Sequence, residues 1–474
     1  MRSSVLDHVR LALGVAIALA TVTAVTPAIG STPSATAAPA SAESRCALPG
    51  SGAPSTASPA SVGIDPGRLD AAIAFASSRL RTNITVFRND CLVGRGPFNA
   101  VTDDLPWNLW SGTKSVVSMV AGVAHSEGRL ALDAPIGRYL PAGEGDAAHR
   151  AITVRDLLTQ TSGLKQSIVS EGIPAALDLD TDIVGQALAL PIVHRPGTFF
   201  EYGQHNADLL AHVVQSAVGE DFQTYAQRTL FAPLGIGRGD WFWNRDRRGN
   251  TYGYAFLYMP PSDFARLGLL MLNDGSWNGR RVIASDYVAA LRTPTATNPC
   301  YGFLFWLNRS PCTGPSIPSR QTQDVAPLAG MPADAYAMVG LMQQNNFIIP
   351  SLDLLVSWTG AFGDVSPDPI TLLSGSLNSE LYHDFLRLLA AAIVRPRLPD
   401  PGPYRPTFNL TVDPDQSADP SIALGAFGLG PYAPKGCTLV RCGDTPLRAP
   451  LQGNPGCFAI TCLPTPTGPG RRPN

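Results

Sequence analysis

The stretch NLWSGTKSVVSMVAGVAHSEG, residues 108–128, decides the fold of this chain. Its apolar residues recur at helical spacing over 111–127, and Gly128 ends the pattern. Ser111 and Lys114 lie three positions apart at the start of this predicted helix, so their side chains share one face, with about 5–6 Å between the Cβ atoms. Free backbone N–H groups and the positive end of the helix dipole also lie there. The pair is therefore either a helix cap followed by a solvated lysine, or the nucleophile and base of a hydrolase.

The same Ser-x-x-Lys spacing recurs in the stretch TSGLK, at Ser162 and Lys165. This copy comes at the end of a short amphipathic helix predicted over 152–164, so we expect it in a turn, with no long helix to fix the two side chains. A lysine takes a proton from serine only in its neutral form, which burial favours because desolvation lowers the lysine pKa. Spacing alone does not separate the two copies, and the decision rests on the surrounding sequence.

The composition is that of a large globular chain without a bias toward nucleic acid. The sequence has 474 residues, 45% of them hydrophobic, and a formal net charge of −2. A chain of this length buries a sizeable core, and the lack of a basic excess excludes nucleic acid as an expected partner. Only three of the 35 basic residues are lysines, namely Lys114, Lys165 and Lys435.

The N-terminus is typical of an export signal. Two arginines precede an apolar run over 11–25, and small residues follow it. The run is shorter than the roughly 20 residues of a bilayer span, so we predict a cleaved signal peptide over 1–37 rather than a retained anchor, and then a linker over 38–60. No second apolar run of spanning length occurs, so we expect no transmembrane segment after cleavage and a secreted or cell-envelope location.

The eight cysteines all lie beyond this signal, and their even number suits disulfides in an oxidising compartment. Neither the cysteines nor the seven histidines have the spacing of a zinc site, so we expect no metal and no cofactor. Sequence neighbours predict the pairs Cys46–Cys91, Cys300–Cys312, Cys437–Cys442 and Cys457–Cys462.

Periodicity along the chain predicts an α+β protein. The predicted helices are 64–80, 111–127, 152–164, 206–219, 221–236, 260–275 and 379–394, and the predicted strands form a hairpin over 83–97 and three strands over 301–308, 335–350 and 352–360. Asp65 is the expected cap of the first helix, and Ser262 or Asp263 that of the sixth. The early hairpin and the late strands together predict one antiparallel sheet, flanked by the terminal helices. We expect an all-helical subdomain at about 103–290 beside this sheet, and a single domain over 61–395 that contains both.

From 396 to 474 the chain becomes a tail rich in Pro and Cys, where we expect little regular structure. It contains the internal repeat KGCTLVRC and PGCFAITC, which predicts two small disulfide-closed loops. Two interpretations stay open for this tail: a protease-resistant spacer, which the composition favours, and a contact with the cell envelope.

Several ordered segments then resemble one family. They are NLWSGTKS (108–115), ITVRDLLTQTSGL (152–164), RPGTFFEYGQHNADLLAHVVQSAVG (195–219) and VGLMQQNNFIIPSLDLLVSWTG (339–360). Over roughly 60–394 the chain resembles the serine β-lactamase and penicillin-binding-protein-like superfamily, most of all its class C-type serine hydrolases, esterases and 6-aminohexanoate-dimer hydrolases. The resemblance implies a β-lactamase/transpeptidase-like fold.

The resemblance also implies a mechanism and a set of site residues. Ser111 would form an acyl-enzyme, with Lys114 as base and Tyr202 sharing the proton transfer. The oxyanion would lie between the backbone N–H of Ser111 and that of Leu341, the residue after Gly340 on a sheet strand. Within the family pattern the Ser162 copy falls outside the catalytic motif.

Two departures from the family pattern bear on the substrate. The Tyr-x-Asn motif ends in Gln204, which is one methylene longer than Asn, and Asn206 is a rival for the same contact. The family's Lys-Thr-Gly or His-x-Gly motif begins here with Met338, which supplies no positive charge for a substrate carboxylate. Hydrolysis needs only the backbone at this place, so the loss favours an ester or amide over a penicillin-like substrate.

These observations lead to one hypothesis and two alternatives. The leading hypothesis is a secreted serine hydrolase that cleaves a small ester or amide. The alternatives are a D,D-peptidase or β-lactamase acting on peptidoglycan or β-lactams, and a non-catalytic binding protein of the cell envelope on the same scaffold. The sequence has no Gly-x-Ser-x-Gly motif, which argues against an α/β-hydrolase.

Overall fold

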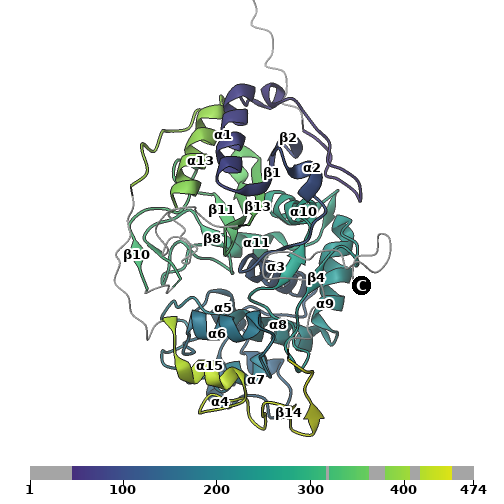
Figure 1. The fold of residues 1–474 in the computed structure, drawn as a ribbon, viewed down its shortest axis with the longest axis vertical. Helices are drawn as coiled ribbons and strands as arrows, with labels where there is room; N and C mark the ends of the chain where they lie inside the picture. Colours follow the sequence, from purple (N-terminus) through teal and green to yellow (C-terminus); the bar gives the residue numbers. More distant parts are fainter. Residues whose placement is uncertain (1–44, 316–319, 362–378, 406–416, 451–474) are drawn as a thin grey trace, which may run out of the picture. The chain divides into compact units, whose positions relative to one another are not determined.

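The central sheet of the protein is built from both ends of the chain (Figure 1). The structure is a computed structural model that describes residues 45–315, 320–361, 379–405 and 417–450. Six strands are hydrogen-bonded in the order β2-β1-β13-β12-β11-β8, each antiparallel to its neighbour. They are β1 (Arg81–Arg88), β2 (Cys91–Arg95), β8 (Trp306–Leu307), β11 (Tyr336–Gly340), β12 (Gln344–Ile349) and β13 (Leu354–Gly360). The predicted α+β class is confirmed.

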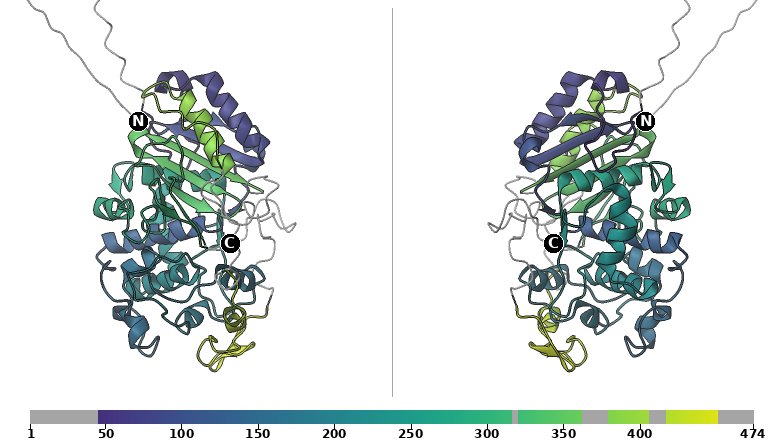
Figure 2. Two further views of the ribbon diagram at one scale, coloured as in Figure 1. Left: turned by 90° about the vertical axis from the view of Figure 1, so that its left-hand side faces the viewer. Right: turned by 90° about the vertical axis from the view of Figure 1, so that its right-hand side faces the viewer.

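Helices cover both faces of this sheet. On β12 the side chain of Asn345 is hydrogen-bonded to Tyr382 of α13 (Glu380–Ala392), whereas the next residue, Asn346, donates to a backbone carbonyl of α10 (Pro261–Leu272). Successive residues of a strand point to opposite faces, so α13 and α10 lie on opposite sides. The N-terminal helix α1 (Pro66–Ser78) packs beside α13, as Figure 2 shows. The terminal helices therefore share one face.

Local sequence explains where several elements begin and turn. The Asp65 side chain accepts a hydrogen bond from the N–H of Arg68 and caps α1, as predicted. Asn89 and Asp90 both have positive φ in the β1–β2 hairpin turn, which these residue types tolerate. The predicted caps of α10 are wrong, because the helix already begins at Pro261, whose fixed φ suits the first helical position.

The region between β2 and β8 is mainly helical. Its helices are α2 (Asn99–Thr102), α3 (Gly112–Ser126), α4 (Ala147–Ala151), α5 (Val154–Leu158), α6 (Ile168–Ala176), α7 (Ile183–Ala187), α8 (His205–Val218), α9 (Phe222–Ala226), α10 and α11 (Ser285–Leu291). The region also holds the short 3-10 helices η2 (Ile136–Arg138) and η4 (Ala232–Leu234) and the π-helix η3 (Gln227–Phe231). Two more 3-10 helices lie outside it, η1 (Pro59–Val62) before α1 and η5 (Pro350–Leu352) between β12 and β13.

Small sheets accompany these helices. The subdomain predicted as all-helical also holds five short strands. Three of them form one sheet in the order β3-β5-β4, namely β3 (Trp107–Asn108), β4 (Phe242–Trp243) and β5 (Leu257–Met259). Two further pairs are β6 (Ser276–Trp277) with β7 (Arg280–Arg281), and β9 (Cys312–Thr313) with β10 (Thr322–Gln323).

Two strand predictions and one helix prediction need correction. The stretch 335–350 is not one strand but the hairpin β11–β12, so Leu341 lies in a turn rather than on a strand. Only Trp306–Leu307 of 301–308 is a strand, because Leu304 takes a positive φ and breaks the extended run. The helix predicted over 221–236 is divided into α9, η3 and η4, with Pro233 inside the last turn.

The described part of the predicted linker is an ordered cover for the sheet edge. Ala57 donates its N–H to the carbonyl of Leu92 on the edge strand β2, and Leu92 donates to the carbonyl of Ser55. Cys46 forms a disulfide with Cys91 at the same strand. The segment thus satisfies backbone groups that an edge strand would otherwise expose.

The tail contains more regular structure than predicted. Helix α15 (Pro420–Ala426) packs against α6 and α7, and the pair β14 (Arg441–Cys442) with β15 (Thr445–Pro446) follows it. The Gln186 side chain donates to the carbonyl of Ile422 at 2.6 Å, and Arg448 forms an ion pair with Asp178 at 2.6 Å. The described part of the tail is therefore docked on the helical subdomain, and the expectation of little regular structure is wrong there.

Three of the predicted disulfides are present, Cys46–Cys91, Cys300–Cys312 and Cys437–Cys442. The predicted pair Cys457–Cys462 and the predicted signal peptide over 1–37 lie outside the described residues. Within the ranges described, every helix is too short or too polar to cross a bilayer.

Candidate active site

Ser111 lies in the connection between β3 and α3, where the backbone is held in a strained form. The preceding residue, Trp110, has a φ of 46°, a left-handed conformation that costs a bulky side chain free energy. Its N–H donates to Asn108 Oδ1 at 2.9 Å, and the same oxygen accepts from the N–H of Phe256 at 3.2 Å. The Ser111 hydroxyl makes no capping hydrogen bond to α3. The serine is thus presented by a fixed turn, and its hydroxyl is not used as a helix cap.

Lys114 is buried directly beside this hydroxyl. Its Nζ lies 3.3 Å from Ser111 Oγ, 2.5 Å from Gln204 Oε1 and 3.4 Å from the carbonyl oxygen of Tyr254. The aromatic rings of Tyr202 and Tyr254 lie 4.7 and 5.2 Å from Nζ. The side chain that spacing alone could assign to solvent is therefore 1% exposed and lies among oxygen acceptors and ring faces.

The surroundings of Lys114 set its protonation. Burial removes the ammonium from water and lowers the pKa of Lys114 to about 7, although the negative charges of Asp208 and Glu171 act in the opposite direction. A substantial neutral fraction near pH 7 follows, and a neutral amine is what a proton acceptor for Ser111 requires.

Tyr202 is a second buried residue beside Ser111. Its hydroxyl is hydrogen-bonded to Ser111, and its ring stacks on Trp306 with centroids 5.5 Å apart. Burial raises the pKa of Tyr202 above its usual value, against the effect of the Ser111 hydrogen bond. Tyr202 therefore stays protonated where Lys114 begins to lose its proton.

The structure separates the two amides that the sequence left as rivals. Gln204 contacts Lys114 through Oε1, so its extra methylene is accommodated. Asn206 instead points to Gln160, whose Oε1 accepts from Asn206 Nδ2 at 2.7 Å. Gln204 thus occupies the place beside the lysine, whereas Asn206 contributes to a buried amide pair.

The turn that carries Leu341 lies against the start of α3. A Cβ at Gly340 would overlap the carbonyl oxygen of Leu109, so glycine is required for this approach. Arg81 holds the turn through two hydrogen bonds of 2.8 Å, to the carbonyl oxygens of Met342 and Gln343. Among the described residues, the backbone N–H groups of Ser111 and Leu341 have no hydrogen-bond acceptor, so both are available to a ligand.

Met338 brings no charge to this region. The side chain is fully buried, and Asn346 Nδ2 lies 3.4 Å from its sulfur. A substrate carboxylate therefore finds no cation at this place in the strand.

The second Ser-x-x-Lys copy has a different environment. Ser162 and Lys165 lie outside any helix, as predicted, but in an irregular loop rather than a tight turn: Ser162 is at a bend, and the N–H of Lys165 donates to the carbonyl of Pro191 at 2.8 Å. Lys165 forms an ion pair with Asp419 of the tail, and its Nζ lies 5.5 Å from the ring of Tyr432. The hydrogen bond that Lys165 donates to the Asp419 carboxylate raises the pKa of Lys165, so this lysine stays protonated. The Ser162 hydroxyl accepts a hydrogen bond from the N–H of Leu164 at 3.3 Å.

Among the described residues, one group of potential metal ligands comes together, at Asp182, Cys437 and Cys442. The two cysteines are joined in a disulfide and offer no thiolate. The group is therefore unsuited to zinc.

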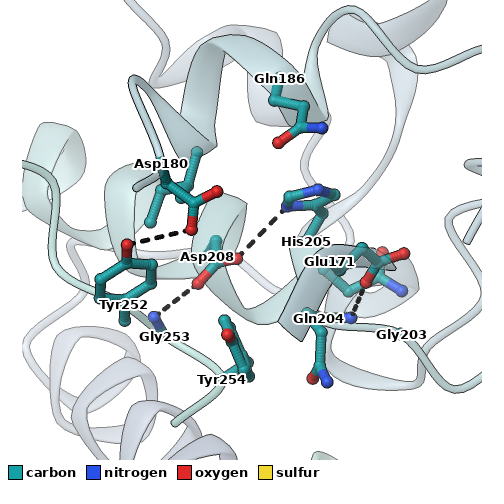
Figure 3. Close-up of polar contacts among 12 residues, drawn as sticks. Glu171, Asp180, Gln186, Gly203, Gln204, His205, Asp208, Tyr252, Gly253 and Tyr254 are labelled. Carbon is teal, nitrogen blue, oxygen red and sulfur yellow. Dashed lines mark hydrogen bonds and ion pairs between the residues drawn. The ribbon is translucent and has the colours of Figure 1, made fainter. Parts of the chain in front are cut away.

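Sequence reasoning missed a buried polar cluster behind Lys114, drawn in Figure 3. It contains Glu171 on α6, Asp180, and His205 and Asp208 on α8. Asp208 Oδ2 lies 3.4 Å from His205 Nδ1. Burial lowers the pKa of His205, but Asp208 and Glu171 outweigh it and raise that pKa above its usual value. A local signal for the cluster was present, since Asp208 stands directly between Ala207 and Leu209 on the buried part of α8.

Comparison with known proteins agrees with this geometry. The model of a family described as Beta-lactamase matches residues 81–367, which is more than half of the chain. Protein flp of Staphylococcus aureus is 27% identical over 131 residues, which are 27% of this chain and only 26% of that relative's length.

Two solved structures share the fold. One, from Bacteroides dorei and described as a β-lactamase, superposes with a TM-score of 0.54 at 19% identity and covers 69% of this chain and 99% of the other. The second, from Bacillus anthracis and described as a 6-aminohexanoate-dimer hydrolase, has a TM-score of 0.52 at 15% identity and covers 67% and 82%. At these identities the likeness concerns the fold alone.

Proposed function

The chain belongs to the β-lactamase family, and from this premise we propose that it is an exported serine hydrolase that cleaves an ester or amide through an acyl-enzyme on Ser111. The observation that carries the proposal is the contact of a buried lysine with a serine hydroxyl: Lys114 Nζ lies 3.3 Å from Ser111 Oγ, and burial lowers the pKa of this lysine to about 7. The three disulfides support the exported location.

In the proposed reaction, neutral Lys114 takes the hydroxyl proton as Ser111 Oγ attacks the substrate carbonyl carbon. The resulting oxyanion accepts hydrogen bonds from the N–H groups of Ser111 and Leu341. When the bond to the leaving group breaks, the proton passes from Lys114 through the Tyr202 hydroxyl to the departing alcohol or amine. Water then gives a proton to neutral Lys114 as its oxygen attacks the acyl carbon, and that proton passes to Ser111 Oγ as the ester bond to the serine breaks and the acid product leaves.

The two candidate bases have unequal roles in this scheme. Burial lowers the pKa of Lys114 and raises that of Tyr202, so the neutral lysine is the better proton acceptor at neutral pH. Tyr202 remains a phenol, which donates one hydrogen bond and accepts another and so relays a proton without ionising.

The buried, uncharged Met338 supports a substrate that needs no carboxylate recognition at this strand. Esters and amides with a neutral acyl part fit this requirement. The fold shared with a protein described as a 6-aminohexanoate-dimer hydrolase is compatible with an amide.

The experiment is covalent labelling of purified protein with a fluorophosphonate probe, and separately with a fluorescent penicillin. We expect the fluorophosphonate to label the wild type and Ser162→Ala equally, and to leave Ser111→Ala unlabelled. We expect the penicillin to label none of the three.

Each alternative predicts a different pattern. Penicillin labelling lost in Ser111→Ala would indicate a β-lactamase or D,D-peptidase. No labelling of the wild type by either probe would favour the non-catalytic binding protein. Labelling lost only in Ser162→Ala would overturn the site assignment.

A further inference from the structure

The two oxygen acceptors of Lys114 belong to chain segments that are far apart in the sequence. One is the Gln204 side chain at the start of α8, and the other is the Tyr254 carbonyl on the segment that leads into β5. Each acceptor follows a glycine. A Cβ at Gly203 would overlap Gln166 Oε1, and a Cβ at Gly253 would overlap the Ala207 carbonyl oxygen. The backbone contact at Gly253 leaves no room for a side chain, whereas a side chain at Gly203 would force the Gln166 side chain to move.

A buried carboxylate holds each of these segments (Figure 3). Glu171 Oε2 accepts the N–H of Gln204 at 2.6 Å, while its Oε1 accepts the N–H of Ser167 at 2.5 Å. Asp208 Oδ1 accepts the N–H of Gly253 at 2.7 Å. Both carboxylates are nearly inaccessible to water, with 2% and 1% exposure. Hydrogen bonds to a charged acceptor are stronger than neutral ones, so these contacts fix the two backbones firmly.

We propose that Glu171 and Asp208 are positioning residues for Lys114, an inference that rests on the proposed function. Each carboxylate accepts a backbone N–H from one of the two segments and so holds in place the oxygen atom that this segment presents to the Lys114 amine. Together the two segments direct Nζ at Ser111 Oγ. Neither carboxylate touches Ser111 or Lys114 directly, and both act through the chain.

The same two carboxylates carry a second, electrostatic effect. The titratable groups that face Lys114 are Tyr202, Tyr254, Asp208 and Glu171, and only the last two carry negative charge toward it. Because an anion favours the ammonium form, loss of either charge lowers the pKa of Lys114. His205, which faces Asp208, reduces this effect when protonated.

Variants at Asp208 separate position from charge. Asp208→Asn keeps an oxygen for the Gly253 N–H but removes the charge, whereas Asp208→Ala removes both. Glu171→Gln removes the charge and leaves one oxygen for two N–H groups. Asp180→Asn is the control within the cluster, because Asp180 is also buried but accepts from the side-chain hydroxyl of Tyr252 at 3.0 Å and from neither of the two backbone N–H groups, of Gln204 and Gly253.

The measurement uses the low lysine content of the chain. With ¹³C-labelled lysine the full-length protein gives ε-carbon signals from three lysines, which Lys165→Arg and Lys435→Arg assign. Titration of these signals reports the protonation of Lys114 without any turnover. In parallel, kcat and KM for a p-nitrophenyl ester are recorded against pH, with the thermal midpoint as a check on folding.

We expect the Lys114 titration and the acid limb of kcat/KM to shift to lower pH in Asp208→Asn and Glu171→Gln, and to stay unchanged in Asp180→Asn. At high pH, Asp208→Asn should retain kcat, while Asp208→Ala should lose about tenfold or more in kcat with a smaller change in KM.

Two results would overturn the inference. One is an unchanged Lys114 titration in both charge-removing variants. The other is a high-pH kcat of Asp208→Ala that equals that of Asp208→Asn. Failure of the proposed function is distinguishable, because it appears as absent ester turnover and absent Ser111 labelling in the wild type, while the lysine titration still tests the electrostatic part.

Discussion

The two Ser-x-x-Lys copies share a spacing and differ in nearly every other physical property. Lys114 is 1% exposed and contacts Ser111, whereas the Lys165 side chain is 33% exposed and forms an ion pair with Asp419. The pKa of the first lysine is lowered to about 7 by burial, and that of the second is raised by its carboxylate partner. The comparison teaches that a spacing supplies only proximity, while distant segments decide whether the amine accepts a proton.

The largest expected effect comes from exchanging each lysine for arginine. Lys114→Arg places a group that cannot lose its proton beside Ser111, so we expect ester hydrolysis to fall by about 10²–10⁴-fold. Lys165→Arg keeps a cation for Asp419 and should leave kcat/KM unchanged. Initial rates with a p-nitrophenyl ester measure both variants. Equal losses in the two would remove the distinction between the copies.

The pH dependence of the wild type sharpens the same comparison. Lys114 acts as base only in its neutral form, and that form increases as pH rises through about 7. We therefore expect kcat/KM to fall by about tenfold per pH unit below about 7 and to level off above it. A base with the raised pKa of Lys165 would instead place the acid limb above the usual lysine range. A profile of kcat/KM from pH 5 to 10 decides between them.

A third test addresses the β11–β12 turn, which lies beside Ser111 and has no counterpart at Ser162. Arg81 binds the carbonyl oxygens of Met342 and Gln343, next to Leu341. Arg81→Lys keeps a charge but removes Nη1, the one nitrogen that donates to both carbonyl oxygens, so we expect kcat to fall by about tenfold with little change in KM. Arg79→Lys, near in sequence but paired with Glu380, is a control and should keep wild-type kinetics. A loss confined to KM would argue against a role in stabilising the oxyanion.

Sequence predicted the parts of the fold that are set locally. The helix after Ser111, the Asn89–Asp90 turn and three disulfides needed only short-range signals. The β11–β12 turn was missed because its two left-handed residues, Met342 and Gln343, carry no turn signal. Their conformation depends on Arg81, more than 250 residues away.

The same limit applies to the candidate site. The contact of Lys114 with Gln204 spans 90 positions and that with Tyr254 spans 140, so only the folded chain reveals them. The tail is a different case, since Asp419 and Pro420 repeat the cap signal of Asp65 and Pro66. There a local signal was present, and the Pro-rich composition concealed it.

The smallest expected effect is on the ion pair of the second copy. Lys165→Met keeps an aliphatic side chain but removes the charge that pairs with Asp419 and lies 5.5 Å from the ring of Tyr432. Because the pair is partly exposed, we expect the free energy of unfolding in urea to fall by about 1 kcal/mol or less, with kcat/KM unchanged. Asp419 also donates its N–H to Ser167 Oγ at 2.8 Å, at the start of the helix that carries Glu171. A change in kcat from Lys165→Met would therefore mean that the docked tail acts on Lys114 through α6, and that the two copies are not independent.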